Sequence, residues 1–234
     1  MKLYEHDFVR NSIRFGVLTL WTIAFFLSFI RISFHYFDHQ REVVSSWLSE
    51  ELNRPIKLAG ITTTWNGWSP RIIADNFVIL SNDLDEELLT SDQIIIDINP
   101  LSSVFSGTLK PTQLLVSGLD LKLERDKQGV FFIVGMPSQK PWFFRWVAAQ
   151  KNISIINSRV SVADNQSERT YQFSKVSASL QNDNGKTRVK TVFLPPRGLG
   201  KLGSVDAAFV GDPLGTDWKA TIKFSAADLS LTAL

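Results

Sequence analysis

Apolar and polar residues alternate along most of the chain after Pro55, a period of two that is typical of β-strands with one apolar face. The alternation is clearest at residues 119–124, where leucines alternate with charged residues, and it recurs at 153–155 and 160–162. Turn sequences such as Asn66-Gly67 separate these segments, which predicts short, mostly antiparallel strands joined by hairpins. The apolar positions expected on one hidden face are Leu119, Leu121, Leu123, Ile153, Ile155, Val160 and Val162.

Four of the predicted strands share a form, with an apolar start, a Gly or an Asn in the middle, and alternation afterwards. They begin at Leu58, Ile73, Leu115 and Ile155. A glycine or asparagine inside a strand often marks a bulge or a bend. Bends at matching places would curl the sheet and give it a concave apolar face and a convex polar face. Chance similarity among short strands is the alternative explanation.

The N-terminal region has a different pattern, an uncharged apolar run from Phe15 to Ile30 between Arg14 and Arg31. With its flanks it predicts a transmembrane helix over residues 15–34, after a cytoplasmic tail of residues 1–14. A cleaved signal peptide is the alternative, but large aromatic and charged residues stand where small residues would mark the cleavage site. The residues expected to form the membrane anchor are Phe15, Leu18, Trp21, Phe25, Phe26, Phe29 and Ile30.

Two further segments have a helical pattern. Residues 38–52 place Val44, Trp47 and Leu48 on one stripe, which predicts a short amphipathic helix within a juxtamembrane region at 35–54. This helix would pack on the sheet or lie on the membrane surface. Residues 141–150 begin with a proline and predict a second short helix.

Composition and motifs argue against several classes of function. The formal net charge of +2 gives no reason to expect a nucleic acid partner, and the absence of cysteine removes disulfides and thiolate sites. We find no nucleophile elbow, phosphate-binding loop or zinc-binding helix motif. All three histidines precede residue 40. The acidic loop from Asp83 to Glu87 predicts a solvated turn, because Leu88 replaces the glycine that a calcium loop needs. We therefore predict no enzyme, no catalytic residue, no cofactor and no metal site.

The segment from Trp65 to Arg71, WNGWSPR, has two tryptophans around Asn-Gly. It predicts a hairpin turn packed by tryptophan. An aromatic anchor at a membrane interface or at the mouth of an apolar groove is the alternative.

The order of several motifs resembles a known family. After the N-terminal apolar helix comes a W-x-G-x-x-P turn at 65–70, then an Asn-Pro-Leu segment running from Asn99 to Gly107. The pattern L-x-V-x-G-L-x-L-x-L-x-R-D-x-x-G follows from Leu114 to Gly129, and Leu194-Pro195-Pro196 and Trp218 come later. This order is similar to the start of an AsmA-like protein, nearest to the YhdP branch.

The resemblance implies a protein anchored in the inner membrane of a Gram-negative bacterium, with its bulk in the periplasm. It implies a bridge-like lipid-transfer fold in which residues 55–234 form an elongated apolar β-groove that continues beyond this chain. The expected function is non-enzymatic phospholipid transport between the inner and outer membranes. The expected partners are phospholipid, the membrane and envelope proteins. A periplasmic scaffold that supports envelope assembly is the alternative.

Overall fold

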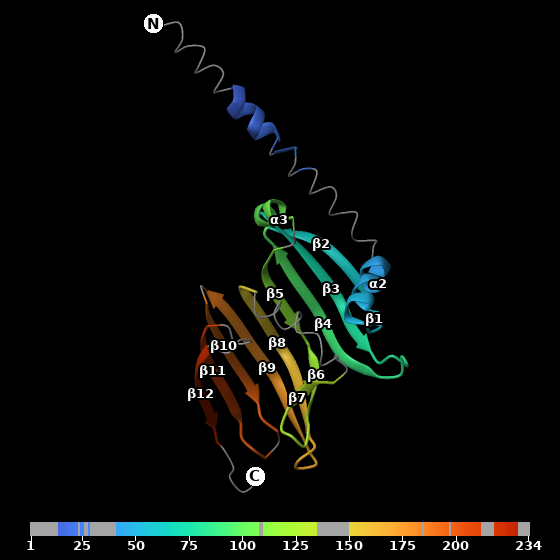
Figure 1. Cartoon of the computed structure of the whole chain (residues 1–234), viewed down its shortest axis with the longest axis vertical. Coiled ribbons are helices and arrows are strands. Elements are labelled where there is room, and N and C mark those ends of the chain that lie inside the picture. The colour runs from blue at the N-terminus through green and yellow to red at the C-terminus, as the bar shows by residue number, and fades with distance from the viewer. Residues whose placement is uncertain are drawn as a thin grey trace, which may run out of the picture.

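The computed structural model describes residues 14–22, 24–25, 28, 41–107, 110–134, 150–183, 185–196, 198–211 and 218–228, apart from the side chains of residues 47, 51 and 52. Within these residues the chain is mainly β, which confirms the predicted class of fold. Figure 1 shows one curved sheet with a helix beside one edge and another helix at one end. An enclosed groove stays a prediction.

The described strands form one 12-stranded sheet. They are β1 (Ile56–Lys57), β2 (Gly60–Asn66), β3 (Ser69–Leu80), β4 (Glu87–Ile98), β5 (Pro111–Ser117), β6 (Asp120–Arg125), β7 (Phe131–Ile133), β8 (Asn152–Asp164), β9 (Arg169–Asp183), β10 (Lys186–Leu194), β11 (Leu202–Gly211) and β12 (Trp218–Ala227). The main path runs β1-β3-β4-β5-β8-β9-β10-β11-β12, with β2 beside β3 and with β6 between β4 and β8.

The sheet is mostly antiparallel, as predicted, with one exception. Strand β8 pairs in parallel with both β5 and β6, whereas every other described pair is antiparallel. A parallel pair cannot be closed by a hairpin, and among the described strands β7 pairs with β6 and not with β8. The expectation that hairpins join successive strands is therefore wrong for β7–β8. It is also wrong for β1–β2 and β5–β6, whose members pair with shared neighbours and not with each other.

A line of backbone bends crosses the sheet. Three of the four predicted bend residues have a positive φ: Asn76 (48°), Gly118 (62°) and Asn157 (49°). Each follows a member of one cross-strand row, which consists of Asp75, Gln93, Ser117 and Ile156. Lys175, with φ of 48°, extends the line into β9. Gly60, the fourth predicted bend residue, has no positive φ. At that edge of the sheet the strand is interrupted between β1 and β2, which both pair with β3.

Helix α2 (Arg41–Leu52) lies beside β1, close to where the sequence placed it. Its serines tie it to the strand: the Ser45 hydroxyl donates to the Ile56 carbonyl, and the Ile56 N–H donates to Ser49 Oγ at 2.9 Å. Helix α3 (Pro100–Ser106) was not predicted. It is capped by the Asn99 side chain, which accepts from the Ser102 N–H at 2.9 Å, and it ends at Gly107 in the left-handed conformation.

The predicted membrane anchor is described only in part. Phe15, Leu18, Trp21 and Phe25 are helical and 66–72% exposed. Phe26, Phe29 and Ile30 lie outside the described residues. Among the residues that the structure describes, no helix combines the length and the apolar character that crossing a bilayer requires. The predicted helix at 141–150 also falls outside the described residues, except for Gln150.

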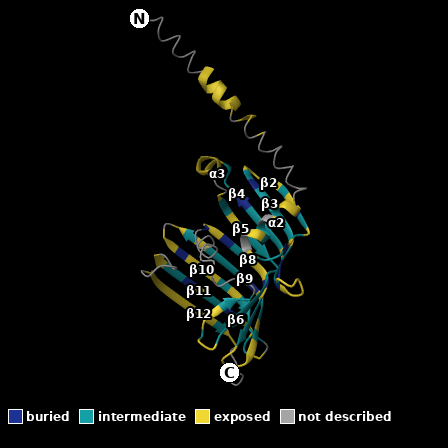
Figure 2. Cartoon of the chain, turned by 45° about the vertical axis from the view of Figure 1, so that its right-hand side comes forward, coloured by how far each residue is buried: buried dark blue, intermediate teal, exposed yellow. Residues whose placement is uncertain are grey.

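The buried core sits mainly in the first third of the sheet. Besides Pro70, the buried apolar residues of the described chain are Ile56, Ile61, Ile79, Leu80, Leu88, Ile98, Ile153, Val176 and Ala207. Six of them lie in β1–β4. Figure 2 shows that exposure increases toward β12, in which every residue except Ala226 is exposed. One sheet without a second described layer leaves much of its apolar surface only half-buried.

Candidate functional site

Cross-strand pairing assembles the predicted apolar residues into continuous rows. Residues directly opposite each other on paired strands point to the same face of the sheet. Ile155 belongs to a row that runs from β2 to β12: Ile61, Ala74, Ile94, Val116, Ile155, Ala178, Thr191, Val205 and Phe224. Ile153 belongs to the row beside it: Thr63, Ile72, Ile96, Leu114, Ile153, Leu180, Val189, Ala207 and Ile222.

A second group of rows lies on the other side of the bend line. Leu121 belongs to the row Ile56, Ile79, Leu89, Leu121, Val160 and Phe173. Leu123 belongs to the row Ile133, Leu123, Val162 and Tyr171. The structure therefore groups six of the seven predicted face residues into two sets. One set consists of Ile153 and Ile155, and the other of Leu121, Leu123, Val160 and Val162.

Leu119 is the seventh predicted residue, and the structure places it in the bend itself, just before β6. Its N–H donates to Ser158 Oγ at 3.1 Å, and its carbonyl accepts from the Arg159 N–H at 2.7 Å. Ser158 is buried, so its hydroxyl satisfies backbone that the distorted ladder leaves unpaired. Leu119 thus takes part in the bend between β6 and β8 through its backbone.

Charged residues occupy the rows between these apolar rows. Arg159 on β8 forms an ion pair with Asp120 on β6 at 2.8 Å, and the two residues lie directly opposite each other, next to the row of Leu121 and Val160. Lys122 pairs with Glu86 at 2.9 Å. Because successive residues of a strand point to opposite faces, these ion pairs lie on the face opposite Leu121 and Leu123. Beyond the bend line on β6 and β8, the sheet thus has one apolar and one charged face.

The apolar rows are only partly shielded from water. Five members of these rows are buried, namely Ile56, Ile61, Ile79, Ile153 and Ala207. The other members on β3–β5 are half-buried, and Ile222 and Phe224 on β12 are 64% and 62% exposed. A sheet face of this kind normally packs against a second layer. Within the described part of the chain no such layer covers it, so the face is suited to an apolar ligand or to an apolar partner.

The strongest polar cluster stands at one end of the sheet. Arg71 on β3 makes two hydrogen bonds to Asp97 on β4, at 2.6 and 2.8 Å, and Asn66 Nδ2 donates to Asp97 Oδ2 at 3.1 Å. Hydrogen bonding from the Arg71 guanidinium, with a smaller share from Asn66, holds the pKa of Asp97 below its ordinary value despite its burial. The cluster joins the β2–β3 hairpin to the end of β4 and has a structural role.

Little in the described residues suggests catalysis. They contain no group of three His, Cys, Asp or Glu side chains that could hold a metal ion. The buried Ser91 hydroxyl donates to the Ser117 carbonyl at 2.9 Å, and the buried Asp97 is paired. The acidic loop is exposed as predicted. The predicted tryptophan-packed turn is only partly right, since Trp65 is half-buried but Trp68 is 80% exposed.

Sequence reasoning missed the parts of the apolar rows outside β6 and β8. On β4 the residues Ile94, Ile95 and Ile96 follow one another without alternation, so only the pairing register shows which of them share a face. On β12 the alternation in WKATIKF did signal Ile222 and Phe224. The same signal could therefore have added β12 to the predicted face.

These features define a class of protein: a mainly β chain built as one bent sheet, with apolar rows on both sides of the bend line that no other described layer covers. The sequence belongs to the YhdP protein family, whose model matches residues 1–234. This confirms the resemblance to the YhdP branch, and membership is consistent with lipid transport in general and with a place in the bacterial envelope. A comparison with curated proteins finds no match.

Proposed function

We propose that this chain is a membrane-anchored, non-enzymatic carrier of phospholipid between the inner and outer membranes, with the acyl chains lying on the apolar rows of the sheet. The observation that supports this most directly is the continuity of those rows from β2 to β12, together with their partial exposure. Curling along the bend line would turn the face into a groove. Ion pairs on the other face at β6 and β8 would keep that side in water.

The energetics suit transport better than storage. Moving an acyl chain out of water onto an apolar surface gains about 0.8 kcal/mol per methylene group. A bilayer offers the same gain, so a lipid passing from bilayer to groove changes its free energy little. Shallow binding of this kind lets lipid move along the face. No energy-coupling motif is visible in the sequence, and a driving force would come from partner proteins.

The proposed organisation follows the sequence. Residues 1–14 form a cytoplasmic tail, 15–34 span the inner membrane once, 35–54 form the juxtamembrane region, and 55–234 form the groove domain in the periplasm. The helical, exposed residues Phe15, Leu18, Trp21 and Phe25 support the anchor. The anchor would hold one end of the groove at the bilayer, where lipid enters.

Phospholipid bound to the purified protein tests this function. The chain should be extracted in a mild detergent, exchanged into a lipid-free amphipol and analysed by native mass spectrometry. We expect one or more phospholipids per chain, and fewer in a variant with Ile155→Asp. A matched Ser154→Asp variant, changed on the opposite face of the same strand, should keep its lipid. Wild-type protein without lipid, or equal loss in both variants, would contradict the proposal.

A scaffold function is the second candidate, and one observation favours it. Strand β12 pairs with β11 along one edge, and Trp218, Ile222 and Phe224 on it are 45–64% exposed. An exposed edge strand can accept a strand from a partner. In this case the apolar rows would pack against protein, and purified chain would retain partner protein without lipid.

A further inference from the structure

Helix α3 is built with its apolar side outward. Leu101, Val104 and Phe105 stand at helical spacing of three and four residues, so they form one stripe. All three are exposed, at 64%, 51% and 89%. Nothing in the helix is buried, and none of its seven residues is charged. A surface helix normally turns such a stripe toward the core.

Polar bonds hold the helix in this orientation. Asn99 caps it, and the Asn99 N–H donates to the Lys110 carbonyl at 2.9 Å. Ser103, which like Pro100 is half-buried, donates its hydroxyl to the Asn99 carbonyl at 2.7 Å and accepts from the Lys110 N–H at 2.9 Å. The serine side therefore faces the protein. The outward stripe is set by these bonds and does not depend on apolar packing.

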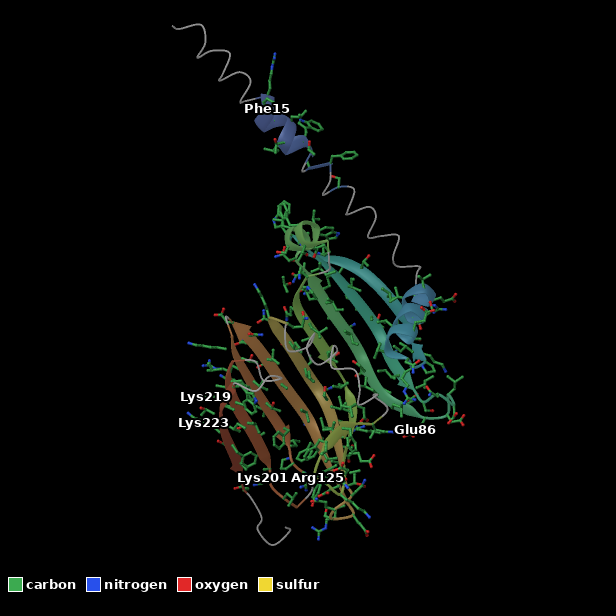
Figure 3. The ribbon with its side chains drawn as sticks, in the orientation of Figure 1. Phe15, Glu86, Arg125, Lys201, Lys219 and Lys223 are labelled. Atoms are coloured by element: carbon green, nitrogen blue, oxygen red, sulfur yellow. The ribbon has the colours of Figure 1, made fainter. Side chains whose placement is uncertain are left out.

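Trp68 adds a second aromatic residue at the same end of the sheet. It lies in the turn between β2 and β3 and is 80% exposed. The Asn66 side chain beside this turn donates to Asp97 on β4, and α3 begins three residues after Asp97. Figure 3 shows α3 at the end of the sheet that faces the helical residues carrying Phe15, and Figure 2 agrees.

We propose that α3 and Trp68 form a membrane-contact tip, defined as Trp68, Leu101, Val104 and Phe105, which dips into the interfacial layer of the bilayer that the N-terminal helix spans. This inference rests on the proposed anchor. Tryptophan and phenylalanine are suited to that layer, and uncharged serines can remain at the head groups. Lys110, which is exposed beside the helix, can meet lipid phosphate.

A second protein copy fits this surface less well. A stable dimer buries about 800 Å² on each partner. The tip offers two aromatic side chains of roughly 150–250 Å² each and two smaller aliphatic ones. This area is too small for a dimer but is sufficient to orient a domain that a transmembrane helix already holds near the bilayer. The tip would set the sheet end against the membrane, so that lipid passes directly onto the apolar rows.

The chain has no cysteine, which permits a single label. Phe105→Cys and, separately, Leu101→Cys would be labelled with the environment-sensitive dye NBD. Val130→Cys, in the β6–β7 turn away from α3 and 55% exposed, is the matched control. The whole chain would be reconstituted into vesicles of phosphatidylethanolamine and phosphatidylglycerol. A fraction of the lipids would carry a nitroxide quencher near the head group.

We expect labels at 105 and 101 to shift to the blue, to brighten several-fold and to be quenched by the nitroxide lipids, and the label at 130 to do none of these. Chain that floats with the vesicles while labels 105 and 101 behave like label 130 would overturn the tip and leave the proposed function standing. A blue shift without lipid quenching would indicate self-association and would also overturn it. Chain that fails to float would reject the anchor and the tip together.

Discussion

A substitution at Leu121 would distinguish an open, lipid-binding face from a packed core. It stands between Leu89 and Val160 in its row and is half-buried. A carboxylate in a sealed core would cost several kcal/mol and prevent folding, whereas on an open face water can reach it. Because Leu121 itself is only half-buried, we expect a carboxylate there to affect lipid binding more than folding.

We predict that Leu121→Asp lowers stability modestly, by about 1–2 kcal/mol, but removes most of the lipid bound by the purified protein. Thermal melting and lipid quantification on the same sample measure both effects. Ser161→Asp is the control, because Ser161 lies on β8 opposite Lys122 and points to the other face of the sheet. It should change neither the stability nor the amount of bound lipid by much. Collapse of the fold on Leu121→Asp would instead show a sealed core.

Asp97 gives a pH-dependent prediction at the same scale. Its pKa is lowered in the folded protein by Arg71, so its stabilising effect is complete above the unfolded pKa of about 3.9 and is lost as the pH falls through the folded pKa. Asp97→Asn should cost roughly 1.5–3 kcal/mol at pH 7, the usual range for a hydrogen bond to a charged group. The difference from wild type should shrink below about pH 4. Urea unfolding at pH 7 and pH 3 measures this, and a difference that is the same at both pH values would show that the negative charge of Asp97 contributes little to stability.

At the scale of elements, the bend line determines how the strands turn. Asn76, Gly118 and Asn157 could be predicted as bends because glycine and asparagine accept a positive φ at little cost. Lys175 could not, because lysine has no such preference. Helix α3 escaped prediction because seven residues are too few to show a helical period.

Gly118→Ala should damage the bend. Gly118 has φ of 62°, and a Cβ there would overlap the Asp92 side chain. The left-handed conformation alone costs a non-glycine residue about 1–2 kcal/mol, and displacement of Asp92 adds to this. Gly60→Ala is the matched control, since its Cβ would meet nothing nearer than Asp75 Oδ2 at 3.9 Å. Guanidinium unfolding of both variants should show the loss at Gly118 only; equal losses would mean that the bend imposes no special requirement.

At the scale of the whole molecule, the sequence predicted one mainly β sheet and the family, and both are confirmed. It could not predict that β8 lies parallel to β5 and β6, because a parallel pair brings together residues far apart in the chain. The extent of the apolar rows depends on that same pairing. Alternation identified members on β6 and β8, and register was needed to join them across the sheet.

The proposed topology also belongs to this scale. One uncleaved span with the N-terminus inside places everything after about residue 38 outside the cytoplasm. Alkaline phosphatase fused after Gly60 should therefore be active, and a fusion after Arg10 should be inactive. An inactive Gly60 fusion, or a mature protein that begins near Ser33, would reject the anchor.

Site-specific photocrosslinking in cells would show whether phospholipid lies on the apolar rows. A photoreactive residue placed in turn at 152, 153, 154 and 155 samples both faces of β8 within one strand. We expect phospholipid adducts at 153 and 155 and few at 152 and 154, because successive residues of a strand point to opposite faces of the sheet. Equal labelling at all four positions, or protein adducts at 153 and 155 without lipid, would contradict it.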